Sequence, residues 1–368
     1  MNFEKALEEL QTLKDVRPEI CKKIKNHNLP VIVFGAGVTA KHVTEVLKSH
    51  GVEVSGYARD GEYYKPNKTY LGRPVYNFDE LATTPEKYIF ILAITDDGSN
   101  SRAYKFMKDN RIIKYAFSYE FNSKNLNYEY ISANREKFSE TFYWLADEFS
   151  KQTMIEFLKL KITHDLAYNF ETYRPDQYFN EITNGVLTPN WGGGYVDCGA
   201  FNGDTVEGFI NWSGGNYEKI FAVEADPMNF AALEKFIQEK NYQNVVAINC
   251  GVWNEKTTLN FSDTNNFGSS VSEDGKIKIN ADTVDNITGG EKISFIKMDV
   301  EGAELPALQG AVETIKKYAP TLAICAYHKT EDLITLPQFI KNLNLDYKFY
   351  LRKYALASDT ELVLYAIP

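Results

Sequence analysis

The stretch Tyr-Val-Asp-Cys-Gly-Ala-Phe-Asn-Gly-Asp-Thr at residues 195–205 constrains the fold more than any other part of the chain. A short apolar run ends in Asp197, Gly199 and Gly203 follow, and the next residues can begin a helix. A strand, a tight glycine turn and a helix start are typical of doubly wound α/β folds that hold nucleotide-like ligands. The glycines let backbone approach a ligand, and the helix start offers free N–H groups to an anion.

A second acid extends this pattern. Glu224 ends the next apolar run, one β-α-β unit after Asp197, where an acid can accept hydrogen bonds from both hydroxyls of a ribose. Asn249 and Cys250 end the third run, at the place where an adenine would lie. The residues predicted to contact the cofactor are Asp197, Gly199, Ala200, Phe201, Asn202, Gly203, Thr205, Glu224, Ala225, Asn249, Cys250 and, at the end of a later strand, Asp299.

Length and composition indicate a chain with more than one domain. Its 368 residues, of which 44% are hydrophobic, are enough for two buried cores. A net charge of −10 argues against nucleic acid as a partner, because a phosphate backbone requires a basic face. The longest apolar runs have the length of strands, so we expect no membrane span, and the charged N-terminus does not resemble a signal peptide. We expect a cytoplasmic protein whose four cysteines are buried apolar residues.

Apolar periodicity divides the chain into four segments. We predict a helical segment at 1–29, a small Rossmann-like β-α-β domain at 30–118, a helical connector at 119–190 and a larger α/β domain at 191–368. In the small domain, strands are expected at 31–34, 52–54 and 88–94, too few for a full six-stranded dinucleotide-binding domain. The connector has helical patches at 142–149 and 154–160.

The larger domain alternates regularly between strands and helices, and no long helix separates its last two strands. Strands are expected near 195–198, 220–224, 245–249, 293–299, 321–327, 346–351 and 361–367, and helices near 204–211, 227–240, 304–317 and 331–343. The segment 257–285, between the third and fourth of these strands, is predicted to form a β-hairpin or loop excursion.

Four ordered motifs of this domain resemble those of FkbM-type S-adenosylmethionine-dependent methyltransferases. They are Val-Asp-Cys-Gly-Ala-Phe-Asn-Gly-Asp-Thr at 196–205, Phe-Ala-Val-Glu-Ala-Asp-Pro at 221–227 with Asn229 and Phe230, Ile-Lys-Met-Asp-Val-Glu-Gly-Ala-Glu at 296–304 with 308–311, and Leu-Ala-Ile-Cys-Ala-Tyr-His-Lys at 322–329. The resemblance covers 195–368 and implies a Rossmann-like seven-stranded methyltransferase sheet with S-adenosylmethionine as cofactor. One departure is Phe201, which stands where the family often has Asn, and Asn202 follows it.

The small domain is similar to the nucleotide-sugar-binding domain that precedes some sugar acyltransferases. The similar segments are 34–41, with the G-x-G-x-x-A fingerprint, 56–60, and 71–75 leading into 79–81. This resemblance implies an accessory nucleotide site formed by Gly35, Gly37 and Asp60. A degenerate domain kept for packing or dimerisation remains the alternative.

The predicted catalytic residues are Asp299 and His328, which end the fourth and fifth main strands. Methyl transfer requires the acceptor oxygen, methyl carbon and sulfur to lie in line, and a positioned base takes the proton of a hydroxyl acceptor. Asp299 could contact acceptor or cofactor, or act as base, or cap the helix that begins near Gly302. His328 is the natural base near neutral pH, although a structural histidine bonded to a loop carbonyl would occupy the same place.

Other polar residues have weaker assignments. Asp299, Glu301, Glu304 and His328 could ligate a hard divalent cation, but their spacing does not demand one and we expect no metal. Glu301 and Glu304 could equally be acids that the helix dipole stabilises in a first turn. Residues that could shape an acceptor pocket are Glu301, Ser269, Ser270, Arg174 and Tyr178.

The predicted function is S-adenosylmethionine-dependent O-methylation of a sugar hydroxyl, in surface polysaccharide or glycolipid biosynthesis. The family resemblance and the small domain imply this acceptor class, a sugar, nucleotide sugar or glycan. One alternative is a catalytically silent scaffold protein that binds a nucleotide sugar. Another, based on Gly35, Gly37 and Asp60, is an NAD-dependent oxidoreductase, which the small domain has too few strands to favour. A homo-oligomer is compatible with the sequence.

Overall fold

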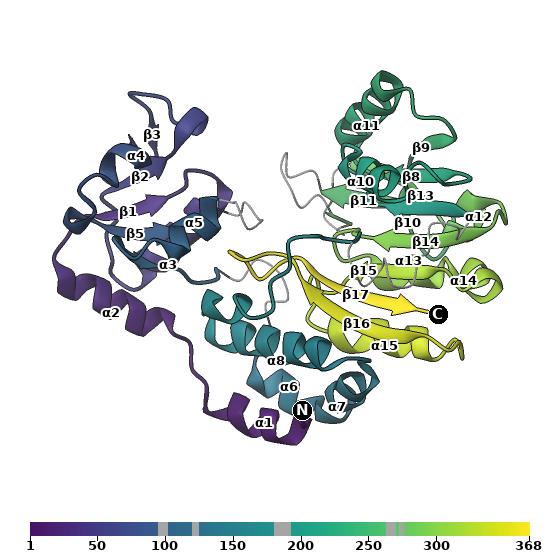
Figure 1. Cartoon of the computed structure of the whole chain (residues 1–368), viewed down its shortest axis with the longest axis horizontal. Coiled ribbons are helices and arrows are strands. Elements are labelled where there is room, and N and C mark those ends of the chain that lie inside the picture. The colour runs from purple at the N-terminus through teal and green to yellow at the C-terminus, as the bar shows by residue number, and fades with distance from the viewer. Residues whose placement is uncertain (95–101, 120–124, 180–192, 263–269, 272–274, 276) are drawn as a thin grey trace. The chain divides into compact units, whose positions relative to one another are not determined.

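The computed structural model describes residues 1–94, 102–119, 125–179, 193–262, 270–271, 275 and 277–368 (Figure 1). The chain divides into two compact units. The first consists of Met1–Phe142, Glu148–Pro175 and Arg352–Leu362, and the second of Tyr143–Asp147, Asp176–Leu351 and Val363–Pro368. Among the described residues, we find no helix with the length and apolar character that crossing a membrane requires.

In the first unit, the described residues form a six-stranded sheet in the order β3-β4-β2-β1-β5-β6. All neighbours are parallel except β3, which pairs antiparallel with β4. The expectation of too few strands is therefore wrong for this sheet, whose edges are completed by short strands that weak apolar runs do not reveal. Its strands are β1 (Val31–Phe34), β2 (Gly56–Arg59), β3 (Thr69–Tyr70), β4 (Arg73–Asn77), β5 (Ile89–Leu92) and β6 (Ile113–Tyr115).

The strand predicted at 52–54 is also wrong. Val52 and Val54 are buried in alternation, which imitates a strand, but they lie in the connection that leads from α3 into β2. Pairing with β1 begins only at Gly56, opposite Ile32. A Cβ at Gly56 would lie 2.5 Å from the ring of Tyr76, so a larger residue at the start of β2 would displace that ring.

Helices surround this sheet and continue into the connector. They are α1 (Phe3–Thr12), α2 (Arg17–His27), α3 (Val38–Ser49), α4 (Phe78–Leu81), α5 (Arg102–Lys108), α6 (Tyr128–Ala133), α7 (Arg135–Trp144) and α8 (Glu148–Thr163). The helical patch predicted at 142–149 is wrong, because it spans the end of α7 and the start of α8, whereas the patch at 154–160 lies inside α8. Within this unit, Lys161 Nζ and Asp359 Oδ2 form a buried ion pair at 2.6 Å.

The second unit contains a seven-stranded sheet in the order β16-β17-β15-β14-β7-β8-β9. From β15 to β9 all neighbours are parallel, and β17 pairs antiparallel with β15, which confirms the predicted methyltransferase-type sheet. β7 lies between β8, the next strand in sequence, and β14, a much later strand. The order of strands therefore reverses at β7, and a crevice is expected at the carboxyl ends of β7 and β14. The strands are β7 (Gly194–Cys198), β8 (Ile220–Glu224), β9 (Val245–Asn249), β14 (Ile293–Met298), β15 (Thr321–Cys325), β16 (Lys348–Lys353) and β17 (Leu362–Ile367).

The helices of this unit match the predicted positions, except that a helix at 284–288 is not predicted and the helix predicted at 304–317 is divided. They are α10 (Asp204–Trp212), α11 (Pro227–Lys240), α12 (Val284–Thr288), α13 (Glu304–Gln309), α14 (Val312–Tyr318) and α15 (Asp332–Lys341). The single helix predicted at 304–317 is two helices that meet at Gly310. A Cβ at Gly310 would lie 2.0 Å from the carbonyl oxygen of Trp253, so close packing against that backbone selects glycine at the break.

A small second sheet, in the order β10-β13-β11-β12, follows the third main strand (Figure 1). It consists of β10 (Gly251–Val252), β11 (Thr257–Ser262), β12 (Ser270–Val271) and β13 (Ile277–Asp282). The antiparallel pairing of β11 with β13 confirms the predicted hairpin excursion. Ser269 lies outside the described residues, and for Ser270 the structure describes only the backbone in β12.

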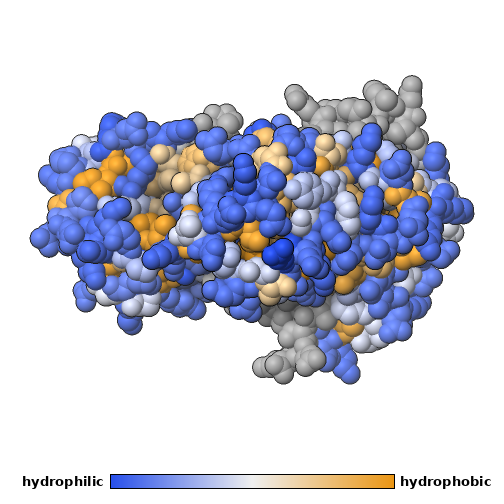
Figure 2. Space-filling model, turned by 90° about the horizontal axis from the view of Figure 1, so that it is seen from below, coloured by the Kyte–Doolittle hydropathy of each residue, from blue (hydrophilic) through white to orange (hydrophobic). Residues whose placement is uncertain are grey.

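The seven-stranded sheet packs on its helices through buried aromatic side chains. Tyr195 of β7 stacks on Phe209 of α10, with ring centroids 4.3 Å apart. Both rings contact Phe295 of β14. On the face shown in Figure 2, most side chains are hydrophilic and the hydrophobic ones lie in small groups among them. The four cysteines are free and buried, as expected.

Candidate active site

The turn after β7 has a backbone conformation that its sequence requires. Gly199 and Gly203 have φ angles of +85° and +94°, in the left-handed region that favours glycine. A Cβ at Gly199 would lie 1.9 Å from the carbonyl oxygen of Asp299, and one at Gly203 would lie 2.5 Å from the Phe236 ring. The turn therefore packs directly against the end of β14, and glycine is needed for contact as well as for conformation.

Phe201, the departure from the family pattern, also has a positive φ of +48°. This conformation is costly for a bulky residue and is tolerated by Asn, the residue the family often has at this place. The backbone N–H of Phe201 donates to Glu224 Oε2 at 2.8 Å. The backbone N–H of residue 201 is therefore the group that contacts Glu224, and this contact does not require an Asn side chain.

Glu224 lies at the end of β8 with its carboxylate buried. Its Oε2 accepts from Phe201 and its Oε1 from the backbone N–H of Asp226 at 2.8 Å. Burial raises the pKa of Glu224 despite these two hydrogen bonds. A carboxylate has about four acceptor positions, so the two that remain can receive ribose hydroxyls.

Asp197 carries the buried charge below the turn. Its Oδ2 accepts from Thr205 Oγ1 at 2.5 Å, and its Oδ1 lies 3.0 Å from Lys297 Nζ. Lys297 also donates to the carbonyl oxygen of Gly199 at 2.6 Å. Burial lowers the pKa of Lys297, but the charges of Asp197 and Asp299 outweigh burial and raise it overall. Sequence reasoning missed Lys297, whose only signal is a lysine inside an otherwise apolar strand.

The remaining cofactor candidates lie around the same turn. Ala200 donates its backbone N–H to the carbonyl of Val223 at 3.0 Å, and Asn202 Oδ1 accepts from the backbone N–H of Asp204 at 3.2 Å. Ala225 follows Glu224 directly, and Asn249 Nδ2 donates to the carbonyl of Glu224 at 2.9 Å. The structure therefore brings the predicted cofactor residues of β7, β8 and β9 to one edge of the sheet.

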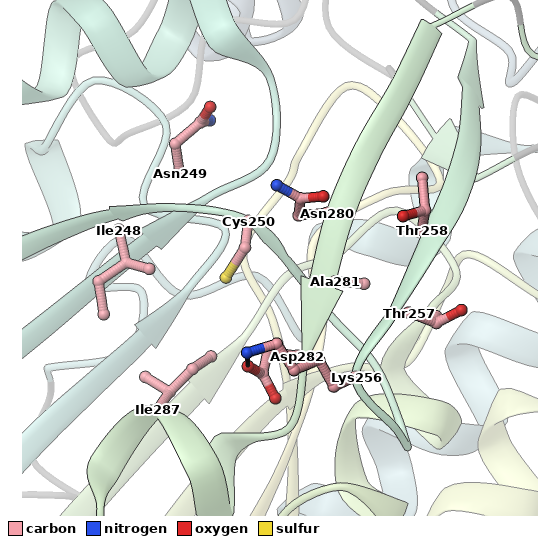
Figure 3. Close-up of a pocket in the computed structure, with 10 residues that line it drawn as sticks. All are labelled: Ile248, Asn249, Cys250, Lys256, Thr257, Thr258, Asn280, Ala281, Asp282 and Ile287. Carbon is pink, nitrogen blue, oxygen red and sulfur yellow. Dashed lines mark ion pairs between the residues drawn. The ribbon is translucent and has the colours of Figure 1, made fainter.

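Asn249 and Cys250, predicted at the adenine end, line a cavity of about 620 Å³ (Figure 3). Its walls come from the end of β9, from β11 and β13 and from Ile287 of α12. Burial raises the pKa of the Cys250 thiol to about 11, which disfavours a reactive thiolate. The full lining consists of Ile248, Asn249, Cys250, Lys256, Thr257, Thr258, Asn280, Ala281, Asp282 and Ile287.

Three acids surround His328 at the carboxyl ends of β14 and β15. His328 Nδ1 lies 2.8 Å from Glu304 Oε1, and Nε2 lies 3.6 Å from Asp299 Oδ1 and 3.5 Å from Glu301 Oε2. Burial lowers the pKa of His328, but the charges of Glu304, Asp299 and Glu301 outweigh it and raise the pKa to about 10. The imidazolium form is thereby favoured at neutral pH.

Two alternatives considered for the acids can now be decided. Helix α13 begins at Glu304 with Ala303 as its N-cap, so the capping role for Asp299 is wrong. Glu304 is in the first turn, as expected, but Glu301 precedes the helix, so the first-turn role is wrong for Glu301. Glu304 Oε1 accepts from the backbone N–H groups of Val300 at 3.1 Å and Gly302 at 3.4 Å. These bonds fix its carboxylate beside the His328 ring.

The predicted acceptor residues are placed unequally. Tyr178 donates its hydroxyl to Asp299 Oδ2 at 3.2 Å, and Glu301 faces His328, so both lie in this cluster. Arg174 belongs to the first unit, where its guanidinium stacks on Phe149 at 3.9 Å from the ring centroid. Its assignment remains a prediction.

The accessory nucleotide site also remains a prediction. Gly35 has a φ of +131°, and a Cβ there would lie 2.2 Å from the carbonyl oxygen of Ala93, so its glycine serves close strand packing. Gly37 precedes α3 and faces open space. Asp60 Oδ1 accepts from Arg102 at 2.9 Å, so this carboxylate is already engaged in an ion pair.

The chain is similar over nearly its whole length to a solved FkbM methyltransferase from Methylobacillus flagellatus. The TM-score is 0.70 at 23% identity, covering 99% of this chain and 98% of that one. An rRNA methylase from Streptococcus thermophilus has a TM-score of 0.31 at 12% identity, covering 48% of this chain and 86% of that one. Fibrillarin from Aeropyrum pernix has a TM-score of 0.33 at 11% identity, covering 49% and 69%. No curated protein matches the chain at a significant level.

The family models give the decisive match. Residues 197–350 match the model described as the methyltransferase FkbM domain, which spans the turn after β7, Glu224, Asp299 and His328. This match confirms the predicted resemblance and identifies methyl transfer from S-adenosylmethionine as the chemistry of the second unit. The chain therefore contains an FkbM methyltransferase domain at residues 197–350.

Proposed function

We propose that this protein is an S-adenosylmethionine-dependent O-methyltransferase that acts on a sugar hydroxyl in surface polysaccharide or glycolipid biosynthesis. The observation that carries the proposal is the position of Asp299. Its backbone carbonyl lies against Gly199 of the cofactor turn, while its carboxylate meets Tyr178 and His328. One residue thus connects the cofactor turn to a polar cluster suited to a hydroxyl-bearing acceptor.

The order of strands supports this arrangement. The strands lie in the order β15-β14-β7-β8-β9. Along their carboxyl ends the candidate residues therefore follow one another as His328, Asp299, the glycine turn, Glu224 and Asn249. Neighbouring strands are about 4.8 Å apart, so the row leads stepwise from an acceptor end to an adenine end. The turn also fits the cofactor, because Gly199 and Gly203 have no side chain of their own and Glu224 has two further acceptor positions.

The chemistry assigns Asp299 the role of proton acceptor. Bound S-adenosylmethionine supplies a methyl group on a sulfonium, and its transfer to a hydroxyl oxygen leaves S-adenosylhomocysteine and one proton. His328 is poorly suited to take that proton because its imidazolium form is favoured, with a pKa of about 10. The Asp299 carboxylate can accept it, while the Tyr178 hydroxyl and His328 hold that carboxylate in place.

The test is a methylation assay with methyl-labelled S-adenosylmethionine and a panel of sugars, nucleotide sugars and glycans. We expect base-stable O-methyl products by mass spectrometry and NMR. Asp299→Asn should lower kcat by about 10²–10⁴-fold, the usual contribution of a positioned base. Asp346→Asn, an exposed acid of the same unit, is the matched control.

Two negative results separate the parts of the proposal. If saturating S-adenosylhomocysteine gives no thermal stabilisation, the cofactor assignment is wrong, since a ligand at about 100 times its Kd adds roughly 2.7 kcal/mol. If S-adenosylhomocysteine binds but no sugar of the panel accepts the label, the acceptor class is wrong. The same thermal measurement with nucleotide sugars tests the accessory site at Gly35, Gly37 and Asp60.

A further inference from the structure

Several ligand-type atoms converge at the carboxyl ends of β14 and β15 without hydrogen bonds. Asp299, Glu304 and His328 each offer one nitrogen or oxygen atom within 4.8 Å of the others. Asp299 Oδ1, Glu304 Oε2 and His328 Nε2 are buried and form no hydrogen bond. The His328 side chain is 4% exposed and that of Glu304 is 1% exposed. Buried polar groups are nearly always satisfied, so this concentration requires an explanation such as a bound ion.

The charges in this cluster are not balanced by the groups that form it. Asp299, Glu301 and Glu304 each have a carboxylate oxygen within 3.6 Å of the His328 ring. The Glu304 side chain is 1% exposed, whereas those of Asp299 and Glu301 are 24% and 36% exposed, and the charge of Lys297 also acts on Asp299. Burying unbalanced charge is costly unless it is paired or coordinates a metal, and a divalent cation would neutralise this set.

The distances around His328 Nε2 match the edges of a metal coordination shell. Nε2 is 3.6 Å from Asp299 Oδ1 and 3.5 Å from Glu301 Oε2. Two ligand atoms that are each about 2.1 Å from a tetrahedral zinc ion lie about 3.4 Å apart. Each of the two separations from Nε2 is therefore close to one edge of such a shell.

The other ring nitrogen lies beside a carboxylate, a neighbour that many metal-bound histidines have. Nδ1 lies 2.8 Å from Glu304 Oε1, whose position is fixed by the backbone N–H groups of Val300 and Gly302. A carboxylate at the remote nitrogen orients a ligating imidazole and raises its basicity. Glu304 would thus act through His328 rather than on the ion.

We propose that Asp299, Glu301 and His328 bind one divalent cation of the zinc type, with Glu304 as the positioning residue for the imidazole. Three protein ligands leave a fourth position open, as in catalytic zinc sites. If the proposed function holds, an acceptor hydroxyl would take this position and the cation would lower the pKa of that hydroxyl. With the cation bound, His328 would be a neutral ligand in place of the imidazolium, and Asp299 would hold the cation through Oδ1 and accept the hydroxyl proton on Oδ2. This inference departs from the expectation of no metal, because residues 299, 301 and 328 come from two strand ends and have no recognisable ligand spacing in sequence.

The full chain, stripped of metal with a chelator, is titrated with Zn²⁺ by calorimetry and with Co²⁺ by visible absorption. We expect one equivalent of Zn²⁺ and the intense Co²⁺ bands of a four-coordinate site. Asp299→Asn, Glu301→Gln and His328→Gln should each lower the affinity at least about tenfold, and Glu304→Gln by about 10–100-fold. His42→Gln and Glu45→Gln change an exposed histidine–glutamate pair on α3, with 3.4 Å between its charged atoms, and should leave binding unchanged.

The inference is overturned if the wild-type chain binds no stoichiometric Zn²⁺, or if folded ligand variants bind it as tightly as the wild type. Circular dichroism reports folding of each variant. Glu301→Gln decides the case if the buried variants do not fold, because the Glu301 side chain is 36% exposed. A chain that binds Zn²⁺ but methylates no sugar would contradict the proposed function and leave the metal site standing.

Discussion

Lys297 Nζ lies 3.0 Å from Asp197 Oδ1, and both side chains are almost completely buried beneath the turn that follows β7. The same ammonium donates to the carbonyl oxygen of Gly199, and Thr205 donates to the other oxygen of Asp197. The pair thus joins the last residues of β14 to both sides of the turn. Its geometry makes the shape of the cofactor turn dependent on one buried charge pair.

Lys297→Met should destabilise the protein strongly, because it leaves the Asp197 carboxylate buried without its partner. We expect a loss of about 3–5 kcal/mol in the free energy of unfolding, measured by urea denaturation. Lys219→Met is the matched control, since Lys219 forms a partly exposed ion pair with Glu291 at 2.7 Å and should cost at most about 1 kcal/mol. Equal losses in the two variants would contradict this account of the turn.

Gly199→Ala should disturb both the turn and Asp299. The added Cβ would lie 1.9 Å from the carbonyl oxygen of Asp299, at a φ of +85° that strains any side chain. We expect a loss of about 1–3 kcal/mol in unfolding free energy from the conformation alone, and weaker binding of S-adenosylhomocysteine by calorimetry. At Gly37 an added Cβ meets nothing within 4 Å, so Gly37→Ala should leave both quantities nearly unchanged. Normal cofactor binding by Gly199→Ala would show that the Asp299 backbone can move away from the added Cβ without disturbing the turn.

Residues at the ends of strands could be predicted because apolar runs mark where a parallel strand stops. Glu224, Asp299 and His328 were each found in this way, and the sheet order places them along one edge. Their mutual arrangement follows from topology alone, which a pattern of β/α alternation specifies well.

Contacts between distant segments could not be predicted. Lys297 and Asp197 are one hundred positions apart in sequence, and the register between β14 and β7 places them side by side. The break at Gly310 is caused by the backbone of Trp253, which belongs to another segment. The contact of Glu304 with His328 likewise depends on how α13 packs beside β15. In each case the local sequence is compatible with several arrangements and tertiary packing selects one.

Glu224→Gln should weaken cofactor binding if this carboxylate receives the ribose hydroxyls. Hydrogen bonds to a charged acceptor contribute about 2 kcal/mol, which corresponds to a loss of roughly thirtyfold in affinity for S-adenosylhomocysteine. Calorimetric titration measures the change. Glu239→Gln, an exposed acid near the end of α11, should bind as the wild type does. Unchanged affinity in Glu224→Gln would place the ribose elsewhere.

His164 gives the first unit a specific dependence of stability on pH. Its side chain is buried after α8, with Arg17 and Asp15 as charged neighbours. Burial, reinforced by the charge of Arg17, lowers the pKa of His164 to about 4. In the unfolded chain the pKa is near its usual value of about 6.5.

Below about pH 6.5, His164 is therefore protonated in the unfolded chain, whereas in the folded protein it is protonated only below about pH 4. The free energy of unfolding should fall by up to about 3 kcal/mol as the pH decreases from about 6.5 to about 4. Below about pH 4, His164 should cause no further loss. Urea denaturation across the window measures the slope. His164→Asn tolerates the φ of +60° and should flatten this slope, whereas His42→Asn, a change at a partly exposed histidine, should not. A slope that survives in His164→Asn would assign the dependence to other groups.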